Sequence, residues 1–276
     1  MLGRSIDGIP YFAFESFEDA GARAIVTTRD GGDSAPPYNS LNLSTSTGDD
    51  EDAVRRNQDR LATILDVAPA GLTFAGQVHG SRVEVVTKDG AGTKFPDTDA
   101  LVTDVPGVPL VILTADCVAV LLLDPGRRVV GIAHAGWRGT LAEIATTTIA
   151  TMVENFGATP ERIVAAIGPS IGPCCYEVGS DVVDAFFAEQ PEIADDVLTT
   201  SDFASAGSFE ESVNTDKKNL DLWRANYLQL LAAGVPDDNI DVTATCTSCN
   251  TGTFYSHRAE NGRTGRFAHA ICLGSA

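Results

Sequence analysis

Two of the four histidines stand where an imidazole ring could meet a metal ion or a substrate. His79 is followed by Gly80, and His134 is followed by Ala135-Gly136. These small neighbours leave room beside each ring. His269, by contrast, alternates with apolar residues. This pattern predicts a core or edge histidine on a strand.

Cys117 lies between two apolar stretches and directly follows Asp116. Cys117 and His134 are 17 residues apart, which is the separation expected if consecutive, adjacent strands present them at one end of a sheet. Together with His79 they would offer one thiolate and two imidazoles to a zinc ion, with a fourth position open. Two other interpretations remain open. Cys117 and His134 could form a nucleophile and base without a metal, or Cys117 could be a buried thiol beside packing histidines.

Four further polar residues lie in turns where a substrate or phosphate could bind, and each has an ordinary structural alternative. Arg138 follows His134 just before a predicted helix, where the first backbone amides favour an anion, although a salt bridge would use Arg138 equally well. Arg29 and Arg258 stand in Gly- or Ser-containing turns with the same two roles open. Asn42 could contact a substrate or bond only local backbone.

The remaining cysteines do not predict a disulfide framework, because six cysteines are few for 276 residues. Cys246 and Cys249 form a single Cys-x-x-Cys pair. Cys174 and Cys175 are adjacent and lack that spacing, so a structural zinc site with four cysteines is not favoured. We expect buried thiols at these positions.

The elements that must position the site residues are clearest between residues 108 and 168. Apolar runs predict strands over 108–113, 118–123, 128–133 and 162–167. Thr140-x-x-Glu143 predicts a capping box that opens a helix ending near Gly157. A strand, a Gly-rich turn and a helix in succession place side chains at the carboxyl end of the strand in a site.

The rest of the chain predicts further elements of both kinds. Helices are expected over 53–65 and 221–233, and strands over 24–28, 74–86, 99–103, 240–245, 254–258 and 266–273. The segment 189–216 is rich in acids and has no Lys or Arg, and we expect an exposed acidic excursion. Because neither a repeat nor a linker is evident, residues 1–276 predict a single domain of mixed α/β type.

The charge and the apolar pattern exclude several classes of function. The chain has 19 Lys and Arg against 38 Asp and Glu, a net charge of −19, which would repel nucleic acid. The longest apolar stretch, 105–123, is interrupted by Pro106, Pro109 and Asp116 and predicts two buried strands instead of a membrane span. The first twenty residues lack a signal-peptide pattern, so we expect a cytoplasmic protein.

Motifs spread from about residue 24 to 273 resemble the YfiH-type family, also called the laccase-domain, polyphenol-oxidase-like or purine nucleoside phosphorylase family. The motifs are Thr27-Thr28-Arg29-x-Gly31-Gly32, Pro37-Tyr38-x-Ser40-Leu41-Asn42-Leu43, Gly48-Asp49, Gln77-Val78-His79-Gly80, Thr114-Ala115-Asp116-Cys117, His134-Ala135-Gly136-Trp137-Arg138-Gly139, Ile167-Gly168-Pro169-x-Ile171-Gly172-Pro173-Cys174-Cys175-Tyr176-Glu177-Val178 and Ser256-His257-Arg258. Their combined order and spacing are specific to this family, although each motif alone is weak.

The resemblance implies an α+β fold, a single-domain layered αββα sandwich with mixed sheets. It also implies a metal bound by the residues that match His79, Cys117 and His134, of which Cys117 and His134 would be catalytic. The expected ion is zinc, with copper as the alternative. The implied reactions are phosphorolysis of adenosine, inosine and 5′-methylthioadenosine, which yields free base and (methylthio)ribose 1-phosphate, and deamination of adenosine to inosine. We expect a monomer or small homo-oligomer.

One departure and two alternative functions accompany this resemblance. Family members commonly carry a histidine two residues before the Gly48-Asp49 pair, where this chain has Ser46, so the choice of substrate can differ here. Members are also described as copper-dependent, laccase-like polyphenol oxidases, but four histidines are too few for a trinuclear copper cluster. The other alternative is a metal-free amidohydrolase that uses Cys117 and His134.

Overall fold

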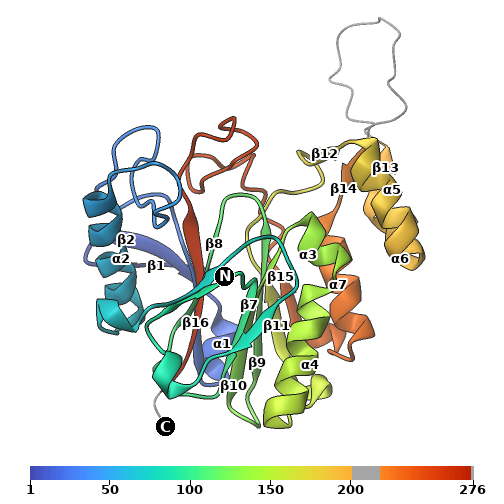
Figure 1. Ribbon diagram of the computed structural model, residues 1–276, viewed down its shortest axis with the longest axis horizontal. Helices are drawn as coiled ribbons and strands as arrows, with labels where there is room; N and C mark the ends of the chain where they lie inside the picture. Colours follow the sequence, from blue (N-terminus) through green and yellow to red (C-terminus); the bar gives the residue numbers. More distant parts are fainter. Residues whose placement is uncertain (201–217, 275–276) are drawn as a thin grey trace, which may run out of the picture.

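Two large β-sheets form the centre of the computed structural model, which describes residues 1–200 and 218–274 (Figure 1). The first sheet has the order β1-β2-β3-β16-β8-β4-β6. Its strands are β1 (Leu2–Ile6), β2 (Ile9–Ala13), β3 (Ala22–Thr27), β4 (Thr73–Gly76), β6 (Lys94–Pro96), β8 (Leu110–Thr114) and β16 (Phe267–Leu273). The strand β16 pairs with β3 and β8 and therefore joins the chain's C-terminal part to its beginning and middle.

The second sheet has the order β15-β11-β9-β10-β7-β5. Its strands are β5 (Val83–Val85), β7 (Ala100–Thr103), β9 (Val118–Asp124), β10 (Val129–Ala135), β11 (Val164–Ile167) and β15 (Ile240–Val242). Most pairs are antiparallel, but β5 runs parallel to β7 and β15 runs parallel to β11. The sequence prediction of strands for the stretch 105–123 is confirmed, because β8 and the start of β9 occupy it.

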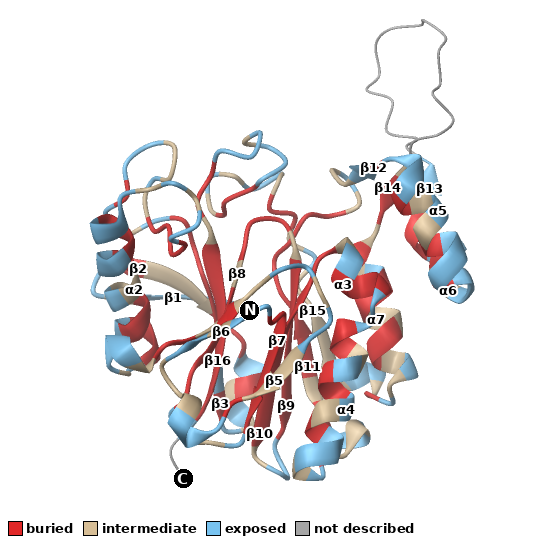
Figure 2. Cartoon of the chain, in the orientation of Figure 1, coloured by how far each residue is buried: buried red, intermediate tan, exposed pale blue. Residues whose placement is uncertain are grey.

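The two sheets pack face to face, and helices cover both outer faces. The residues between the sheets include Ile112 of β8 and Leu121 of β9. On the outer face of the first sheet, α2 (Glu51–Leu65) packs against residues such as Val111. On the outer face of the second sheet lie α4 (Ile144–Phe156) and α7 (Leu222–Ala232). Figure 2 shows buried residues along both sheets and on the sheet-facing sides of the helices. The predicted αββα sandwich with mixed sheets is confirmed.

A small third sheet lies beside this sandwich. It has the order β12-β14-β13 and is accompanied by two helices. The elements are β12 (Glu177–Val178), α5 (Ser180–Glu189), α6 (Pro191–Val197), β13 (Leu198–Thr200) and β14 (Lys218–Leu220). The segment expected to form an acidic excursion, 189–216, thus begins with α6 and β13, in which Ala194 and Val197 are buried. Its residues 201–216 lie outside the described residues.

The predicted capping box at Thr140 and Glu143 is wrong. A short helix, α3 (Trp137–Leu141), already contains Thr140, and Glu143 adopts a left-handed conformation (φ 51°) between α3 and α4. The Thr140 hydroxyl donates to the carbonyl oxygen of Ala135 and accepts from Asn226. Because these tertiary bonds occupy the hydroxyl, it does not cap a helix.

Two of the predicted strands also differ from the structure. Residues 74–86 contain the separate strands β4 and β5, which belong to different sheets, with His79 in the loop between them. Residues 254–258 form a loop, where the backbone amide of Arg258 bonds the Asp116 carboxylate instead of a neighbouring strand. A short helix, α1 (Glu15–Asp19), lies between β2 and β3. Among the described residues, no helix is both long enough and apolar enough to cross a membrane.

Candidate functional site

His79, Cys117 and His134 come from three loops or strand ends and meet at one point. Their ligand atoms all lie within 4.8 Å of one another. The Cys117 Sγ is 4.0 Å from Nε2 of His79, and the two imidazole rings are 4.9 Å apart at their centres. The antiparallel pairing of β9 and β10 causes this meeting, because it sets Val118 opposite Ala135. Cys117 and His134 therefore lie at the same end of the second sheet.

Asp99 positions both histidines, and the sequence reasoning missed it. Its fully buried carboxylate accepts a hydrogen bond from Nδ1 of His134 at 2.9 Å. It also accepts from the backbone amides of residues 78, 79 and 80 at 2.8–3.1 Å. These bonds stabilise the left-handed conformation of His79 (φ 62°). Because Nδ1 of His134 is used, its Nε2 is left for a metal ion. The sequence offered one signal for the role of Asp99, which is an acidic residue directly before the apolar strand 100–103.

The site favours a thiolate at Cys117. Burial alone would raise the pKa of this thiol, but the nearby imidazoles of His134 and His79 lower the pKa below its usual value. Burial would likewise lower the pKa of His134, but the Cys117 thiolate and the Asp99 carboxylate raise that pKa above its usual value. The Asp99 pKa is lowered, since the hydrogen bonds that it accepts outweigh its burial. The centre therefore pairs two anions, the Cys117 thiolate and the Asp99 carboxylate, with one His134 imidazolium, and keeps a net negative charge that a bound cation can neutralise.

Asp116 connects the turn of Cys117 to two other loops. It has a left-handed backbone (φ 99°). Its carboxylate accepts from the hydroxyl of Thr247 at 2.7 Å and from the backbone amide of Arg258 at 2.6 Å. Its carbonyl oxygen accepts from the amide of Ile171 at 2.8 Å. The loops that carry residues 171, 247 and 258 are thus held directly against the turn that presents Cys117.

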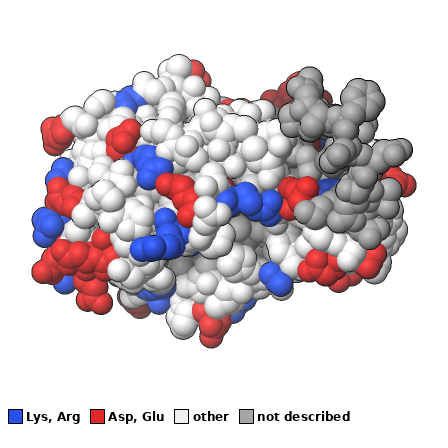
Figure 3. Space-filling model, turned by 90° about the horizontal axis from the view of Figure 1, so that it is seen from above, with Lys and Arg blue, Asp and Glu red and all other residues white. Residues whose placement is uncertain are grey.

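A cavity of about 1040 Å³ opens over the three ligands. His134 is buried, Cys117 is half-buried and His79 is exposed, so one side of the ligand group faces the cavity. The wall includes the cations Lys94, Arg258 and Arg266. Figure 3 shows the face that carries the loops at the top of Figure 1, with basic side chains over its middle and many acidic ones toward its margins. Such a cavity can accept a small anion despite the chain's net charge.

Of the residues predicted to bind substrate or phosphate, Arg258 lies in the cavity wall. Its Nη1 donates to the carbonyl oxygens of Cys175 and Glu177, and its guanidinium lies 5.2 Å from the centre of the Tyr176 ring. These contacts hold a positive charge at the edge of the cavity. Tyr176 also lines the cavity, and burial, followed by the negative charge of Cys117, raises its pKa. Tyr176 therefore remains a neutral donor at neutral pH.

The structure does not bring Arg29, Asn42 or Arg138 into the cavity wall. Arg29 is buried, pairs with Glu260 at 3.0 Å and donates to the carbonyl oxygen of Thr251. Asn42 is also buried and bonds the segment 44–49 and the amide of residue 266. The guanidinium of Arg138 stacks on Trp137, 4.1 Å from the ring centre. In this structure, Arg29 and Asn42 organise loops around the cavity.

The other histidines and Ser46 occupy distinct places. His257 is exposed and lines the cavity beside Arg258. His269 is fully buried in β16, 3.4 Å from the hydroxyl of Thr114, which confirms the prediction of a core histidine. Ser46, where the resemblance led us to expect a histidine, also lines the cavity. The cavity wall therefore carries a hydroxyl group at this position.

The expectation of separate, buried thiols at the remaining cysteines is wrong for three of them. Cys174 and Cys249 are exposed and Cys175 is half-buried, whereas Cys246 is buried as expected. The four sulfur atoms lie within 4.8 Å of one another. Adjacent cysteines can join such a group because they lie in a turn that faces a second loop, which carries Cys246 and Cys249. Cys272 is buried in β16.

The sequence from residue 23 to residue 274 matches the model of a family described as multi-copper polyphenol oxidoreductase laccase. The chain belongs to this family. Purine nucleoside phosphorylase YlmD of Geobacillus stearothermophilus is 41% identical over 254 residues, which cover 90% of this chain and 88% of that protein. Adenosine deaminase RL5 of an unknown prokaryotic organism is 36% identical over 253 residues, covering 89% of this chain and 92% of that protein.

Solved structures show the same fold. The crystal structure of Bacillus licheniformis hypothetical protein YfiH has a TM-score of 0.88 and 34% identity, and the match covers 98% of each chain. The crystal structure of YlmD from Geobacillus stearothermophilus has a TM-score of 0.81 and 40% identity over 93% of each chain. These structures and the family model confirm the resemblance to the YfiH-type family that the motifs predicted.

Proposed function

We propose that this chain is a zinc-dependent purine nucleoside enzyme. It cleaves adenosine, inosine and 5′-methylthioadenosine with phosphate, and it deaminates adenosine to inosine. The observation that carries this proposal is the meeting of His79, Cys117 and His134 beneath a cavity whose wall holds cations. The names of the relatives YlmD and RL5, a purine nucleoside phosphorylase and an adenosine deaminase, point to the same substrates.

The donor atoms fit zinc. One thiolate and two imidazoles around a common point are a ligand set that zinc accepts, and three protein ligands leave a position for a reactant. The hydrogen bond from His134 to Asp99 is the outer contact that zinc-binding histidines usually make. When bound, such an ion supplies Lewis-acid chemistry to an oxygen of phosphate, water or substrate. Copper is the alternative ion, since imidazole and thiolate also suit it.

The chain's own residues would then bind and orient the reactants. In phosphorolysis an oxygen of phosphate bonds to C1′ of the ribose while the bond from C1′ to the purine breaks. Arg258, with Lys94 and Arg266 in the same wall, would neutralise the phosphate. The neutral Tyr176 would donate a hydrogen bond to the substrate. The binding roles predicted for Arg29, Asn42 and Arg138 would have to act through the loops that these residues support.

The test is a metal and product analysis of the purified protein. We expect zinc in the wild type and turnover of adenosine and inosine, with adenine, hypoxanthine and inosine measured separately, with and without phosphate. A Cys117→Ala variant should lose both this zinc and turnover, because it lacks the thiolate ligand. The matched control is Cys272→Ala, which removes a buried cysteine far along β16 and should retain both.

The same experiment separates the two alternatives. A metal-free amidohydrolase that uses Cys117 and His134 is favoured by the lowered pKa of Cys117 and by a His134 ring nitrogen within 4.8 Å of its sulfur. That enzyme would be fully active without any metal and would be inactivated by thiol alkylation. A polyphenol oxidase, as the family description states, would oxidise phenols faster than it turns over nucleosides and would require copper.

A further inference from the structure

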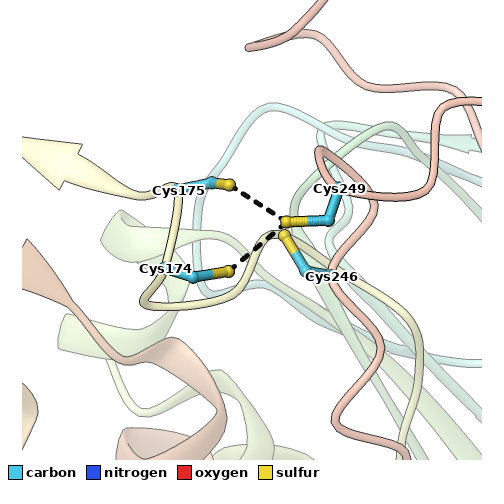
Figure 4. A group of neighbouring side chains, drawn as sticks. All are labelled: Cys174, Cys175, Cys246 and Cys249. Carbon is cyan, nitrogen blue, oxygen red and sulfur yellow. Dashed lines mark hydrogen bonds between the residues drawn. The ribbon is translucent and has the colours of Figure 1, made fainter. Parts of the chain in front are cut away.

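Four cysteines from two loops form a second cluster that the proposed reaction does not use. Cys174 and Cys175 lie in the turn that precedes β12, and Cys246 and Cys249 lie in the loop after β15. Figure 4 shows all four sulfur atoms pointing toward a common centre between the loops. We propose that these four cysteines bind a structural zinc ion. The proposal does not depend on the nucleoside reaction.

The sulfur positions match a single tetrahedral ion. Cys249 Sγ lies 3.4 Å from the sulfur of Cys175 and 3.6 Å from the sulfur of Cys174. All four sulfur atoms lie within 4.8 Å of one another. Zinc–sulfur bonds of about 2.3 Å in a tetrahedron place the sulfur atoms about 3.8 Å apart. Small shifts of exposed side chains would therefore complete the coordination.

The backbone around the cluster is arranged to stabilise thiolate charge. The amide of Gly172 donates to the Cys246 sulfur at 3.3 Å. The side chain of Asn250 donates to the carbonyl oxygen of Cys246 at 2.8 Å and holds that loop closed. Arg258 donates to the carbonyl oxygen of Cys175 and so brings a positive charge to the turn. These contacts offset the net negative charge that four thiolates leave on a divalent ion.

Other uses of four cysteines fit the geometry less well. Cys249 is close to both Cys174 and Cys175, whereas a disulfide would select one partner and leave the other thiol unused. An iron–sulfur cluster holds its thiolates around several metal atoms and therefore needs them further apart. Four thiolates around one point are the usual ligands of a closed, structural zinc site.

The ion would hold two parts of the active cavity together. The first loop contributes Ile171 and Tyr176 to the cavity wall. The second loop carries Thr247, which bonds Asp116 beside Cys117, and it continues to Arg258. Within the described residues, backbone hydrogen bonds join the two loops at Ser170, which bonds Thr245 and Thr247 on either side of Cys246. A bond through the ion would make the wall rigid.

The decisive measurement is the zinc content of wild type and variants. We expect about two zinc ions per chain in the wild type and about one in Cys249→Ser, which retains the His79–Cys117–His134 centre. Cys117→Ala should also hold about one, and Cys272→Ser, the matched control, about two. In Cys249→Ser we expect the KM for phosphate to rise several-fold while kcat changes less, because the wall that carries Arg258 loosens.

Cobalt substitution of the wild type tests the same point without a variant that could misfold. Four thiolates should produce intense sulfur-to-cobalt charge-transfer absorption and strong tetrahedral d–d bands. The inference would be overturned if the wild type held one zinc ion per chain, Cys117→Ala held none, and the cobalt protein showed only weak charge-transfer absorption. The proposed function would then still stand. Iron in place of zinc, or intact disulfides among these cysteines by mass spectrometry, would also overturn the inference. Two zinc ions without nucleoside turnover would contradict only the proposed function.

Discussion

Single residues around the three ligands decide whether the ligands can act together. Asp99 joins the loop of His79 to the ring of His134 through four hydrogen bonds to one carboxylate. Gly136 leaves space beside the Cys117 sulfur. Neither residue presents an atom for catalysis, yet both determine where the ligand atoms lie. Their substitution should therefore change metal affinity before it changes the fold.

Asp99→Asn should weaken metal binding about 10- to 100-fold. The variant replaces one acceptor oxygen with an NH₂ group, which faces backbone amides of residues 78–80 and leaves these donors without their acceptor. The measurement is zinc affinity by competition with a chromophoric chelator, together with turnover. The matched control is Asp104→Asn, an exposed acid after the same strand, β7. Equal affinities for both variants and the wild type would contradict the role of Asp99.

Gly136→Ala should also lower metal affinity and turnover. The new methyl carbon would lie 3.0 Å from the Cys117 sulfur and 3.4 Å from a ring carbon of His79. Because the φ of Gly136 is −63°, alanine can adopt the backbone conformation, and the effect comes from crowding alone. Zinc content after dialysis against a chelator is the measurement. Gly252→Ala, where the methyl group meets open space, should behave as the wild type.

At the scale of elements, one helix end and one strand each contain a residue that lowers the free energy of unfolding, and the packing of these elements compensates for this loss. The helix α2 ends at Asp66, which has a left-handed backbone (φ 57°) and places a negative charge at the negative end of the helix. In β16, His269 is a fully buried imidazole beside the hydroxyl of Thr114. Both features are tolerated because α2 packs against the first sheet, and β16 is an inner strand of that sheet, paired with β3 and β8.

Asp66→Gly should stabilise the protein by about 1 kcal/mol, since glycine adopts the left-handed conformation without steric cost. The substitution also removes the negative charge of the exposed Asp66 side chain from the negative end of the helix dipole. Urea unfolding gives the change in free energy. Asp59→Gly, at an exposed position within the same helix, should instead destabilise the protein by about 0.3 kcal/mol. A loss of stability in Asp66→Gly would show that the aspartate itself supports the cap.

His269 should make stability depend on acidity. Burial, with a smaller effect of His134, lowers its pKa from 6.5 to about 3. Below pH 6.5 the unfolded chain binds a proton that the folded chain excludes, so this group reduces stability as the pH falls from 6.5 toward 3. The loss is about 1.4 kcal/mol per pH unit for one proton. In urea unfolding from pH 7 to pH 5, His269→Leu should lose less stability than the wild type; parallel curves would refute this.

At the scale of the whole molecule, a strongly acidic protein surrounds a cavity with three cations in its wall. The net charge is −19, while Lys94, Arg258 and Arg266 line the cavity. Distant acids repel an approaching phosphate, and the cations attract it only at short range. This distribution is consistent with the exclusion of polyanions and with the binding of a small anion.

Salt should therefore accelerate the use of phosphate. Raising the ionic strength from about 0.01 M to 0.15 M shortens the screening length from about 30 Å to 8 Å and removes the repulsion of distant acids. We expect kcat/KM for phosphate to rise over this range, while kcat/KM for uncharged adenosine stays constant. Steady-state rates at fixed pH provide the measurement. A fall in kcat/KM for phosphate would contradict this, because it would mean that attraction by the cations of the cavity outweighs repulsion by the distant acids.

The sequence by itself singled out His79, Cys117 and His134, which the structure brings together, and it predicted much of the framework. Strands such as β8, β9 and β10 were predictable because burial on both faces requires continuous apolar runs. The three site residues could be singled out because the chain contains only four histidines and six cysteines, and small residues flank His79 and His134. The α2 helix was predictable from its apolar spacing and the acids at its start.

Only the tertiary structure decided which polar groups share a partner. The Thr140 hydroxyl bonds Asn226 instead of capping a helix, and Asp99 bonds two histidine segments far from it in sequence. Likewise, Cys174 and Cys175 meet Cys249 across more than seventy residues of chain. Local sequence patterns record which side chains are apolar along an element. They do not record which loops the sheet pairing places side by side, and that placement creates both clusters.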